Sequence, residues 1–132
     1  MTRGRALVVG ASHAGAQVAA SLRQEGWDGE VVLVGDEAAL PYQRPPLSKA
    51  YLVGRSSREE LAIRKTEFYA KQEIRLVRAT VTSIDRAAGC VVTSEGETLA
   101  YDGLALCTGG RARRLFLPGS DLPGIHYLRT FA

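Results

Sequence analysis

The chain has 132 residues, of which 45% are hydrophobic and 23% charged, and its formal net charge is +3. This length suits one domain, and the composition is ordinary for a globular protein in water. No apolar run approaches the roughly 20 residues that cross a bilayer. The first strand-like segment begins too early to leave room for a signal peptide, so we expect a cytoplasmic protein without a membrane segment.

The densest basic cluster consists of Arg111, Arg113 and Arg114. We interpret it as a solvated loop, in preference to a patch that attracts an acidic partner or cofactor phosphates. The arginines do not alternate with stacking aromatic residues, so nucleic-acid binding is not expected.

Cysteine and histidine usage points away from metal and thiol chemistry. Cys90 and Cys107 are far apart and lie in apolar, strand-like segments, so we expect two buried thiols that act as small hydrophobic groups. His13 and His126 are equally far apart, and the chain has no CxxC motif. The sequence therefore predicts no metal site.

A glycine turn between a strand and a helix opens the chain. Residues 5–9 are apolar and rich in β-branched side chains, residues 14–25 are rich in alanine, and a second apolar segment covers 30–34. The turn at 10–15 joins the first strand to the helix, and Asp36 follows the second strand. Strand, glycine turn, helix, strand and acid is the plan of a dinucleotide-binding βαβ unit.

The turn matches the dinucleotide fingerprint at two of its three glycine positions. Gly10 stands where a tight turn is needed and Gly15 where helix and strand pack closely, while Ser12 takes the place of the glycine beside the pyrophosphate. Asp36 lies where a carboxylate accepts hydrogen bonds from ribose hydroxyls, although a turn residue or helix cap would look the same. We favour the cofactor interpretation, with His13 as a tolerated turn residue.

Downstream segments are expected to complete a parallel sheet and to add a small antiparallel one. We expect short helices at 47–52 and 66–72, the second capped by Thr66. Further strands are expected at 73–77 and 103–108 in the parallel sheet, and at 80–85, 90–94 and 98–101 in an antiparallel meander. The tail beyond Gly110 is expected to be extended and irregular.

The segment 40–49 is rigid and charged, with a double proline and no periodicity. Rigid loops beside a cofactor turn often carry functional side chains. Lys49 would then be a cation near a flavin or a phosphate, and the alternative is a solvated lysine.

Five segments carry a family resemblance: VVGASHAG (8–15), LVGDE (33–37), PPLSKAYL (45–52), CTGGR (107–111) and YLRT (127–130). On these segments the chain resembles the N-terminal part of the FAD-dependent ferredoxin and rubredoxin reductases, within the pyridine nucleotide-disulphide oxidoreductase superfamily. The resemblance implies an α/β fold, namely a three-layer Rossmann-like FAD-binding domain with a meander at about 80–101. Residues 1–132 would form only part of that domain, without the NAD-binding and C-terminal domains.

The resemblance also implies the chemistry. In the full-length family, FAD carries electrons from NAD(P)H to a ferredoxin-type iron–sulfur protein, and the protein orients and tunes the flavin. Related disulfide reductases carry a redox cysteine pair after the acidic residue, but residues 41–49 contain no cysteine. A dithiol relay is therefore excluded there.

The resemblance implies cofactor-binding residues and no catalytic side chain. The pyrophosphate would contact Gly10, Ser12, Ala14 and Gly15, with His13 in the same turn, and Asp36 would bind ribose with Glu37 beside it. Arg44 and Lys49 would lie near the pyrophosphate and the flavin ring, Pro45 against that ring, and Val81 on the adenine side. Cys107, which replaces the family's usual alanine, would precede the contacts of Thr108 and Gly109, and Arg129 would lie at the edge of FAD.

Two rival interpretations stay open. A plain NAD-binding dehydrogenase domain would continue the βαβ pattern, which the double proline and the meander do not do. A non-catalytic structural or interaction fragment would fold without binding FAD. Because the FAD domain would lack its last strand, we also expect weak FAD binding, no hydride transfer by the chain alone, and either self-association through the open sheet edge or disorder after Gly110.

Overall fold

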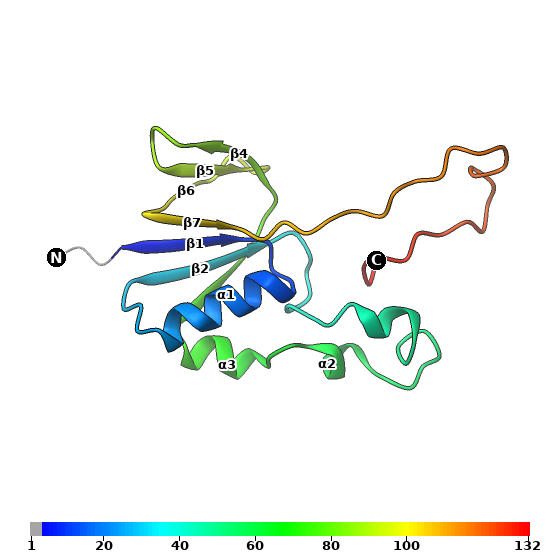
Figure 1. The fold of residues 1–132 in the computed structure, drawn as a ribbon, viewed down its shortest axis with the longest axis horizontal. Coiled ribbons are helices and arrows are strands. Elements are labelled where there is room, and N and C mark those ends of the chain that lie inside the picture. The colour runs from blue at the N-terminus through cyan, green and yellow to red at the C-terminus, as the bar shows by residue number, and fades with distance from the viewer. Residues whose placement is uncertain (1–3) are drawn as a thin grey trace.

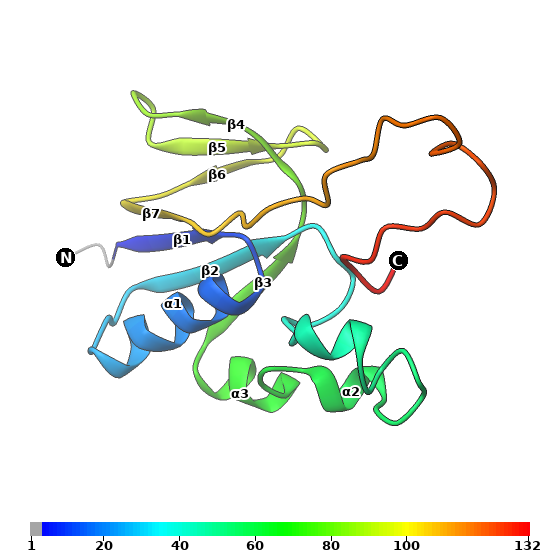
Figure 2. The same cartoon turned by 45° about the vertical axis from the view of Figure 1, so that its right-hand side comes forward.

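The computed structural model describes residues 4–132 and contains two sheets (Figures 1 and 2). The parallel sheet has the order β3-β2-β1-β7, from β1 (Arg5–Val9), β2 (Glu30–Gly35), β3 (Ile74–Arg78) and β7 (Gly103–Leu106). The antiparallel sheet has the order β4-β5-β6, from β4 (Val81–Asp85), β5 (Cys90–Thr93) and β6 (Thr98–Ala100). The helices are α1 (His13–Gln24), the 3-10 helix η1 (Pro45–Ser48), α2 (Arg58–Leu61) and α3 (Thr66–Lys71).

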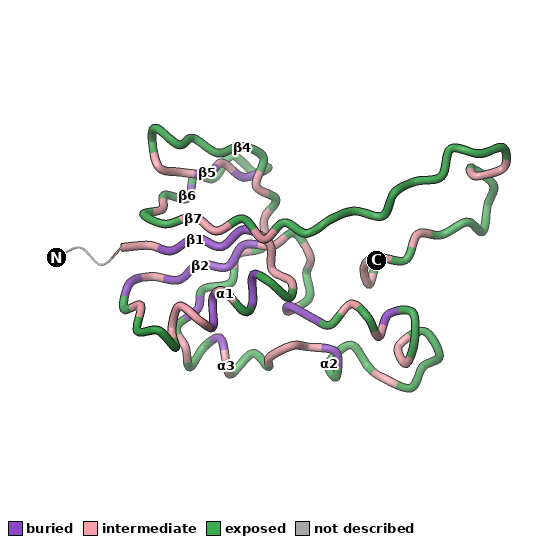
Figure 3. Tube along the Cα trace, viewed as in Figure 1, coloured by how far each residue is buried: buried purple, intermediate pink, exposed green. Residues whose placement is uncertain are grey.

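Alternating side chains of the parallel strands form two cores, one on each face of the sheet. On one face Val8, Val31 and Leu33 pack with Ala19 of α1 and Tyr69 of α3. On the other face Leu7, Val9, Val32 and Val34 pack against Val91 and Leu99 of the antiparallel sheet. Buried residues therefore concentrate along the central strands (Figure 3). This confirms the predicted three-layer α/β architecture.

The strand order of the parallel sheet reverses beside β1. β1 pairs with β2 on one side and with β7 on the other, all in parallel. The chain thus moves outward from β1 to β3 and then returns to the far side of β1. In such sheets, ligands bind outside the carboxyl ends of the strands where the order reverses, here between β1 and β7.

Several local predictions are wrong. In place of a helix at 47–52, the double proline starts a 3-10 helix that ends at Ser48, because Lys49 leaves the helical region with φ −131° and ψ −112°. Helix α3 begins at Thr66 itself, and its N-cap, Lys65, makes no side-chain capping hydrogen bond. The cysteines, predicted to be buried, are only half-buried: Cys90 is the first residue of β5, and Cys107 directly follows β7.

The sequence interpretation also missed the short helix α2. A capping box starts it, because Ser57 accepts a hydrogen bond from the Glu60 amide while the Glu60 carboxylate accepts one from the Ser57 amide. No helix within residues 4–132 combines the length and apolar character needed to cross a membrane.

The last segment, residues 107–132, has no helix or strand and is largely exposed. It leaves the end of β7, runs outward and returns toward η1 (Figures 1 and 2). Its return is anchored by Phe131, whose ring stacks on Tyr42 with a centroid separation of 3.9 Å. The predicted irregular tail is thus confirmed, and its end packs against the double-proline segment.

Candidate nucleotide-binding site

The carboxyl ends of β1, β2 and β7 meet at the first glycine turn. The Gly10 amide donates to the Val34 carbonyl at 2.8 Å, and the Cys107 amide donates to the Val9 carbonyl at 2.7 Å. Gly10 has φ +112°, and a Cβ there would lie 2.0 Å from the Cys107 carbonyl oxygen. Only glycine allows the end of β7 to approach the turn this closely.

Helix α1 begins directly above this turn with free amide groups. A Cβ on Gly15 would lie 1.7 Å from the Gly10 carbonyl oxygen, so this glycine lets the helix rest on the turn. Ser12 is the N-cap, but its side chain makes no capping hydrogen bond, and the first turn contains no acidic residue. The amides of His13, Ala14 and Gly15 have no acceptor within the helix. Together with the helix dipole they form a place where an anion is stabilised.

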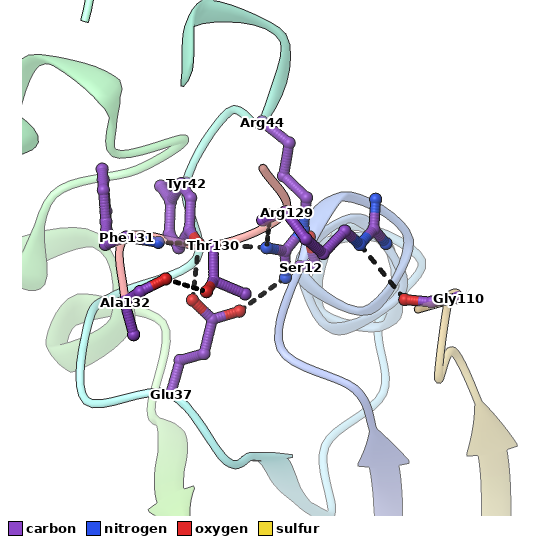
Figure 4. Close-up of polar contacts among 9 residues, drawn as sticks. All are labelled: Ser12, Glu37, Tyr42, Arg44, Gly110, Arg129, Thr130, Phe131 and Ala132. Carbon is purple, nitrogen blue, oxygen red and sulfur yellow. Dashed lines mark hydrogen bonds and ion pairs between the residues drawn. The ribbon is translucent and has the colours of Figure 1, made fainter. Parts of the chain in front are cut away.

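Arg44 brings a positive charge to this helix end (Figure 4). Its Nε donates to Ser12 Oγ at 3.2 Å, and its Nη2 forms a 2.6 Å ion pair with Glu37 Oε1. Its Nη1 donates to the Tyr42 hydroxyl at 3.0 Å and to the Arg129 carbonyl at 2.8 Å. The guanidinium is therefore held in one orientation by four residues from three segments: the first glycine turn, the loop between β2 and η1, and the tail.

Tyr42 lies at the centre of this network and was not predicted from the sequence. It is only 4% exposed, and its hydroxyl donates to Glu37 Oε2 at 2.5 Å. The same hydroxyl accepts from Arg44 and, at 3.3 Å, from the Phe131 amide. Burial, followed by the hydrogen bond to Glu37, raises the pKa of Tyr42 to about 12. The phenol thus stays a neutral donor well above physiological pH.

A cavity of about 240 Å³ lies beside Arg44. It is lined by Arg44, Pro45, Leu47, Ser48, Leu128 and Arg129. Three of the predicted cofactor-binding residues therefore line one cavity: the neighbours Arg44 and Pro45, and Arg129, which is distant in sequence.

The second glycine turn lies on the β7 side of the same edge. Gly109 has φ +64°, and a Cβ there would lie 3.3 Å from Arg129 Nη2. Arg129 Nε also donates to the Gly110 carbonyl at 3.1 Å. Thr108 and Gly109 are exposed. The structure thus joins the second turn to Arg129, as two of the predicted contacts to one cofactor would require.

Asp36 lies at the same edge, and its carboxylate is open. It is exposed immediately after β2 and makes no hydrogen bond or ion pair within residues 4–132. Glu37, by contrast, has both carboxylate oxygens engaged, by Tyr42 and Arg44. The two neighbouring acids therefore have different surroundings.

Lys49 and Val81, two further predicted site residues, have different surroundings. Lys49 is exposed, and its Nζ donates to the Pro45 carbonyl at 3.3 Å. Val81 belongs to β4 and packs against the core between the two sheets. A hydrogen bond of 2.9 Å from the Ala79 amide to the Gly35 carbonyl keeps the start of β4 near the end of β2. No group of three His, Cys, Asp or Glu side chains within residues 4–132 is placed to hold a metal ion.

The sequence pattern of the pyridine nucleotide-disulphide oxidoreductase family matches residues 4–132. The chain belongs to this family. Its members are oxidoreductases, and the ferredoxin reductases among them bind FAD and NAD(P)H. As a member of the family, the chain resembles several bacterial reductases along nearly its whole length.

Among these relatives, a probable ferredoxin reductase of Castellaniella defragrans is 46% identical over 127 residues, which are 96% of this chain and 31% of the relative. Rhodocoxin reductase of Rhodococcus erythropolis is 46% identical over 94% of this chain and 29% of its own. Putidaredoxin reductase of Pseudomonas putida is 47% identical over 94% of this chain and 30% of its own. The 132 residues thus span roughly a third of these relatives.

Solved structures agree with the sequence relatives. A ferredoxin reductase from Rhodopseudomonas palustris superimposes with a TM-score of 0.91 at 44% identity, covering 96% of this chain and 31% of that one. Putidaredoxin reductase in a covalent complex with putidaredoxin gives a TM-score of 0.83 at 44% identity, covering 87% of this chain and 28% of that one. The predicted family membership is confirmed.

Proposed function

We propose that this chain is the FAD-binding portion of a cytoplasmic, NAD(P)H-dependent flavoprotein reductase that passes electrons to a ferredoxin- or rubredoxin-type iron–sulfur protein. The relatives that support this assignment are three times as long or more, since the chain spans 29–31% of each. We therefore propose further that hydride transfer from NAD(P)H needs more chain than these 132 residues.

The observation that carries the proposal is the open N-terminus of α1 at the switch point of the sheet. Its first-turn amides have no capping side chain and no acidic neighbour, and the Arg44 guanidinium reaches Ser12 at the same place. A pyrophosphate carries the charge and the acceptor oxygens that these groups lack. The residues at this helix end thus fit the pyrophosphate of FAD.

Other residues near the carboxyl ends of the parallel strands would hold the ribose and the flavin half of FAD. Asp36 would accept hydrogen bonds from ribose hydroxyls, because its carboxylate is exposed beside the turn and unpaired in residues 4–132. Pro45 and Arg129, which line the cavity beside Arg44, would contact the flavin half of FAD. Thr108 and Gly109 would approach it from the β7 side.

Bound FAD supplies the redox chemistry, accepting a hydride and releasing electrons. The chain's own residues bind and orient it. Because residues 41–49 contain no cysteine, no disulfide in that segment can relay the electrons.

The test is a titration of the purified chain with FAD, followed by quenching of flavin fluorescence. We expect saturable binding that Asp36→Asn weakens by roughly tenfold or more, since hydrogen bonds to a charged group are worth about 1.5–3 kcal/mol. Asp121→Asn is the matched control, because Asp121 is an exposed aspartate in the tail. A folded chain that binds no FAD, or equal affinities in the two variants, would contradict the proposal. Binding of NADH in place of FAD would favour the NAD-binding alternative.

A further inference from the structure

The Arg44 guanidinium is held in place by groups of this chain. Four of its contacts are hydrogen bonds or ion pairs of 2.6–3.2 Å, to Ser12, Tyr42, Glu37 and the Arg129 carbonyl. Of these four contacts, the bond to Ser12 is at the N-terminus of α1, and the other three come from the loop after β2 and from the tail (Figure 4). An arginine side chain has large rotamer entropy, so fixing it in advance removes a cost that a ligand would otherwise bear.

Tyr42 and Glu37 make the largest share of these holding contacts. The Tyr42 hydroxyl donates to one carboxylate oxygen of Glu37, and the other oxygen accepts from Arg44. The same hydroxyl accepts from Arg44, so the three side chains form a closed ring of hydrogen bonds. Neither Tyr42 nor Glu37 has a hydrogen bond to the first turn of α1 within residues 4–132.

We propose that Tyr42 and Glu37 are positioning residues that hold the Arg44 guanidinium across the N-terminus of α1, where it binds the diphosphate of the nucleotide cofactor. This inference rests on the proposed function and extends it to two residues. Glu37, which the family resemblance implies as a cofactor contact, acts through Arg44. The role differs from that of Asp36, whose carboxylate is exposed.

A positioning role and simple charge competition predict opposite results for Glu37. Glu37 neutralises part of the Arg44 charge, so removing its charge would strengthen anion binding if competition dominated. If Glu37 positions the guanidinium, removing its charge loosens Arg44 and weakens diphosphate binding. The sign of the change therefore decides between the two roles.

The main experiment replaces Tyr42 with phenylalanine. Tyr42→Phe keeps the ring that stacks on Phe131 and removes only the hydroxyl. Tyr51→Phe is the matched control: it removes a hydroxyl that accepts from the Arg58 Nε at 3.1 Å, on a ring that also contacts Phe131. Dissociation constants for FAD, ADP, adenosine and riboflavin are measured on the chain and on both variants.

The expected result is a phosphate-specific loss. Tyr42→Phe should weaken FAD and ADP alike, by roughly fivefold, as the loss of one net hydrogen bond suggests. Adenosine and riboflavin, which have no phosphate, should bind unchanged, and Tyr51→Phe should leave all four constants unchanged. A role in general stability alone would move the adenosine and riboflavin constants as well.

Glu37→Gln provides a second variant in case Tyr42→Phe fails to fold, since the amide keeps an acceptor for Tyr42. We expect weaker ADP and FAD binding, and tighter binding would overturn the positioning role. Equal ADP affinity in the chain, Tyr42→Phe and Glu37→Gln would overturn it too, while wild-type FAD binding would leave the proposed function intact. If the folded wild-type chain binds neither FAD nor ADP, the proposed function fails and the inference fails with it.

Discussion

The two glycine turns lie at the same edge of the parallel sheet, yet they are held in place by different means. The first, at Gly10, is fixed by backbone atoms, because a Cβ there would lie 2.0 Å from the Cys107 carbonyl oxygen. The second, at Gly109, touches only a side chain, with Arg129 Nη2 at 3.3 Å from the Cβ position. A 12-residue helix follows the first turn, whereas residues 110–132, which follow the second, contain no helix or strand.

This difference shows that the carboxyl ends of the parallel strands carry one rigid turn, at Gly10, and one adjustable turn, at Gly109. The first turn presents backbone amides whose direction is set by the helix and the adjacent strands. The second turn depends on Arg129, twenty residues further along, and through it on the network around Arg44. Changes at the first turn should therefore affect the whole fold, and changes at the second should stay local.

The largest expected effect comes from adding one methyl group to each turn. Gly10→Ala meets a backbone oxygen and places alanine at φ +112°, so we expect a loss of about 4 kcal/mol or more in the free energy of unfolding, or failure to fold. Gly109→Ala is the matched variant, at φ +64° with only a flexible side chain nearby, and should cost about 1 kcal/mol. Denaturant unfolding measures both. Similar losses for the two variants would remove the distinction between the turns.

A smaller effect is expected from alkaline titration of Tyr42, which anchors the returning tail. Its pKa is raised from 10 to about 12 in the folded protein, chiefly by burial. The neutral phenol is therefore favoured by folding, and its contribution is complete below pH 10 and is lost as the pH rises toward 12. The loss should be on the order of 2 kcal/mol.

Thermal unfolding measured across this alkaline range tests the point. Tyr42→Phe should show a flatter fall in stability than the wild type, while Tyr51→Phe should follow the wild type. The pKa of buried Tyr69 is also raised, by burial, so part of the alkaline loss is common to all three proteins. A Tyr42→Phe profile that parallels the wild type would show that folding does not raise the pKa of Tyr42.

The smallest expected effect comes from Arg129→Ala, which removes the side chain at the second turn. We expect a loss of about 0.5–1 kcal/mol or less in global stability, because its hydrogen bond to the Gly110 carbonyl is exposed. Hydrogen exchange should quicken at residues 108–110 and stay unchanged in α1. Faster exchange at the first turn as well would show that the two turns are one cooperative unit.

The sequence was most informative where structure is local. The strand–turn–helix unit, the parallel strands and the meander each follow from short patterns of apolar residues and glycines, and all are present. The helix α2 was also predictable, because Ser57 and Glu60 have the spacing of a capping box. The double proline was misleading, since it favours a first helical turn but does not continue it.

The network around Arg44 could not be predicted as a whole, because two of the four residues that contact the guanidinium, Ser12 and Arg129, are remote in sequence. The contact with Ser12 spans 32 residues, and that with the Arg129 carbonyl spans 85. Arg44 itself was suggested by family resemblance, but nothing in the local pattern distinguishes Tyr42 as the residue that holds it. Three predictions stay predictions: the contacts of individual residues with FAD, the self-association of the chain, and disorder after Gly110.

The central claim is that the carboxyl edge of the parallel sheet binds the diphosphate of FAD. The most direct test is to titrate isotope-labelled chain with ADP and FAD and to follow the backbone amide resonances by NMR. Both ligands should shift the amides of residues 11–16 and 36–37, FAD should also shift those of 108–110, and the turns of the antiparallel sheet at 86–89 and 95–97 should stay unchanged. Shifts confined to the antiparallel sheet or to the tail, with the amides of 11–16 unmoved, would contradict the account.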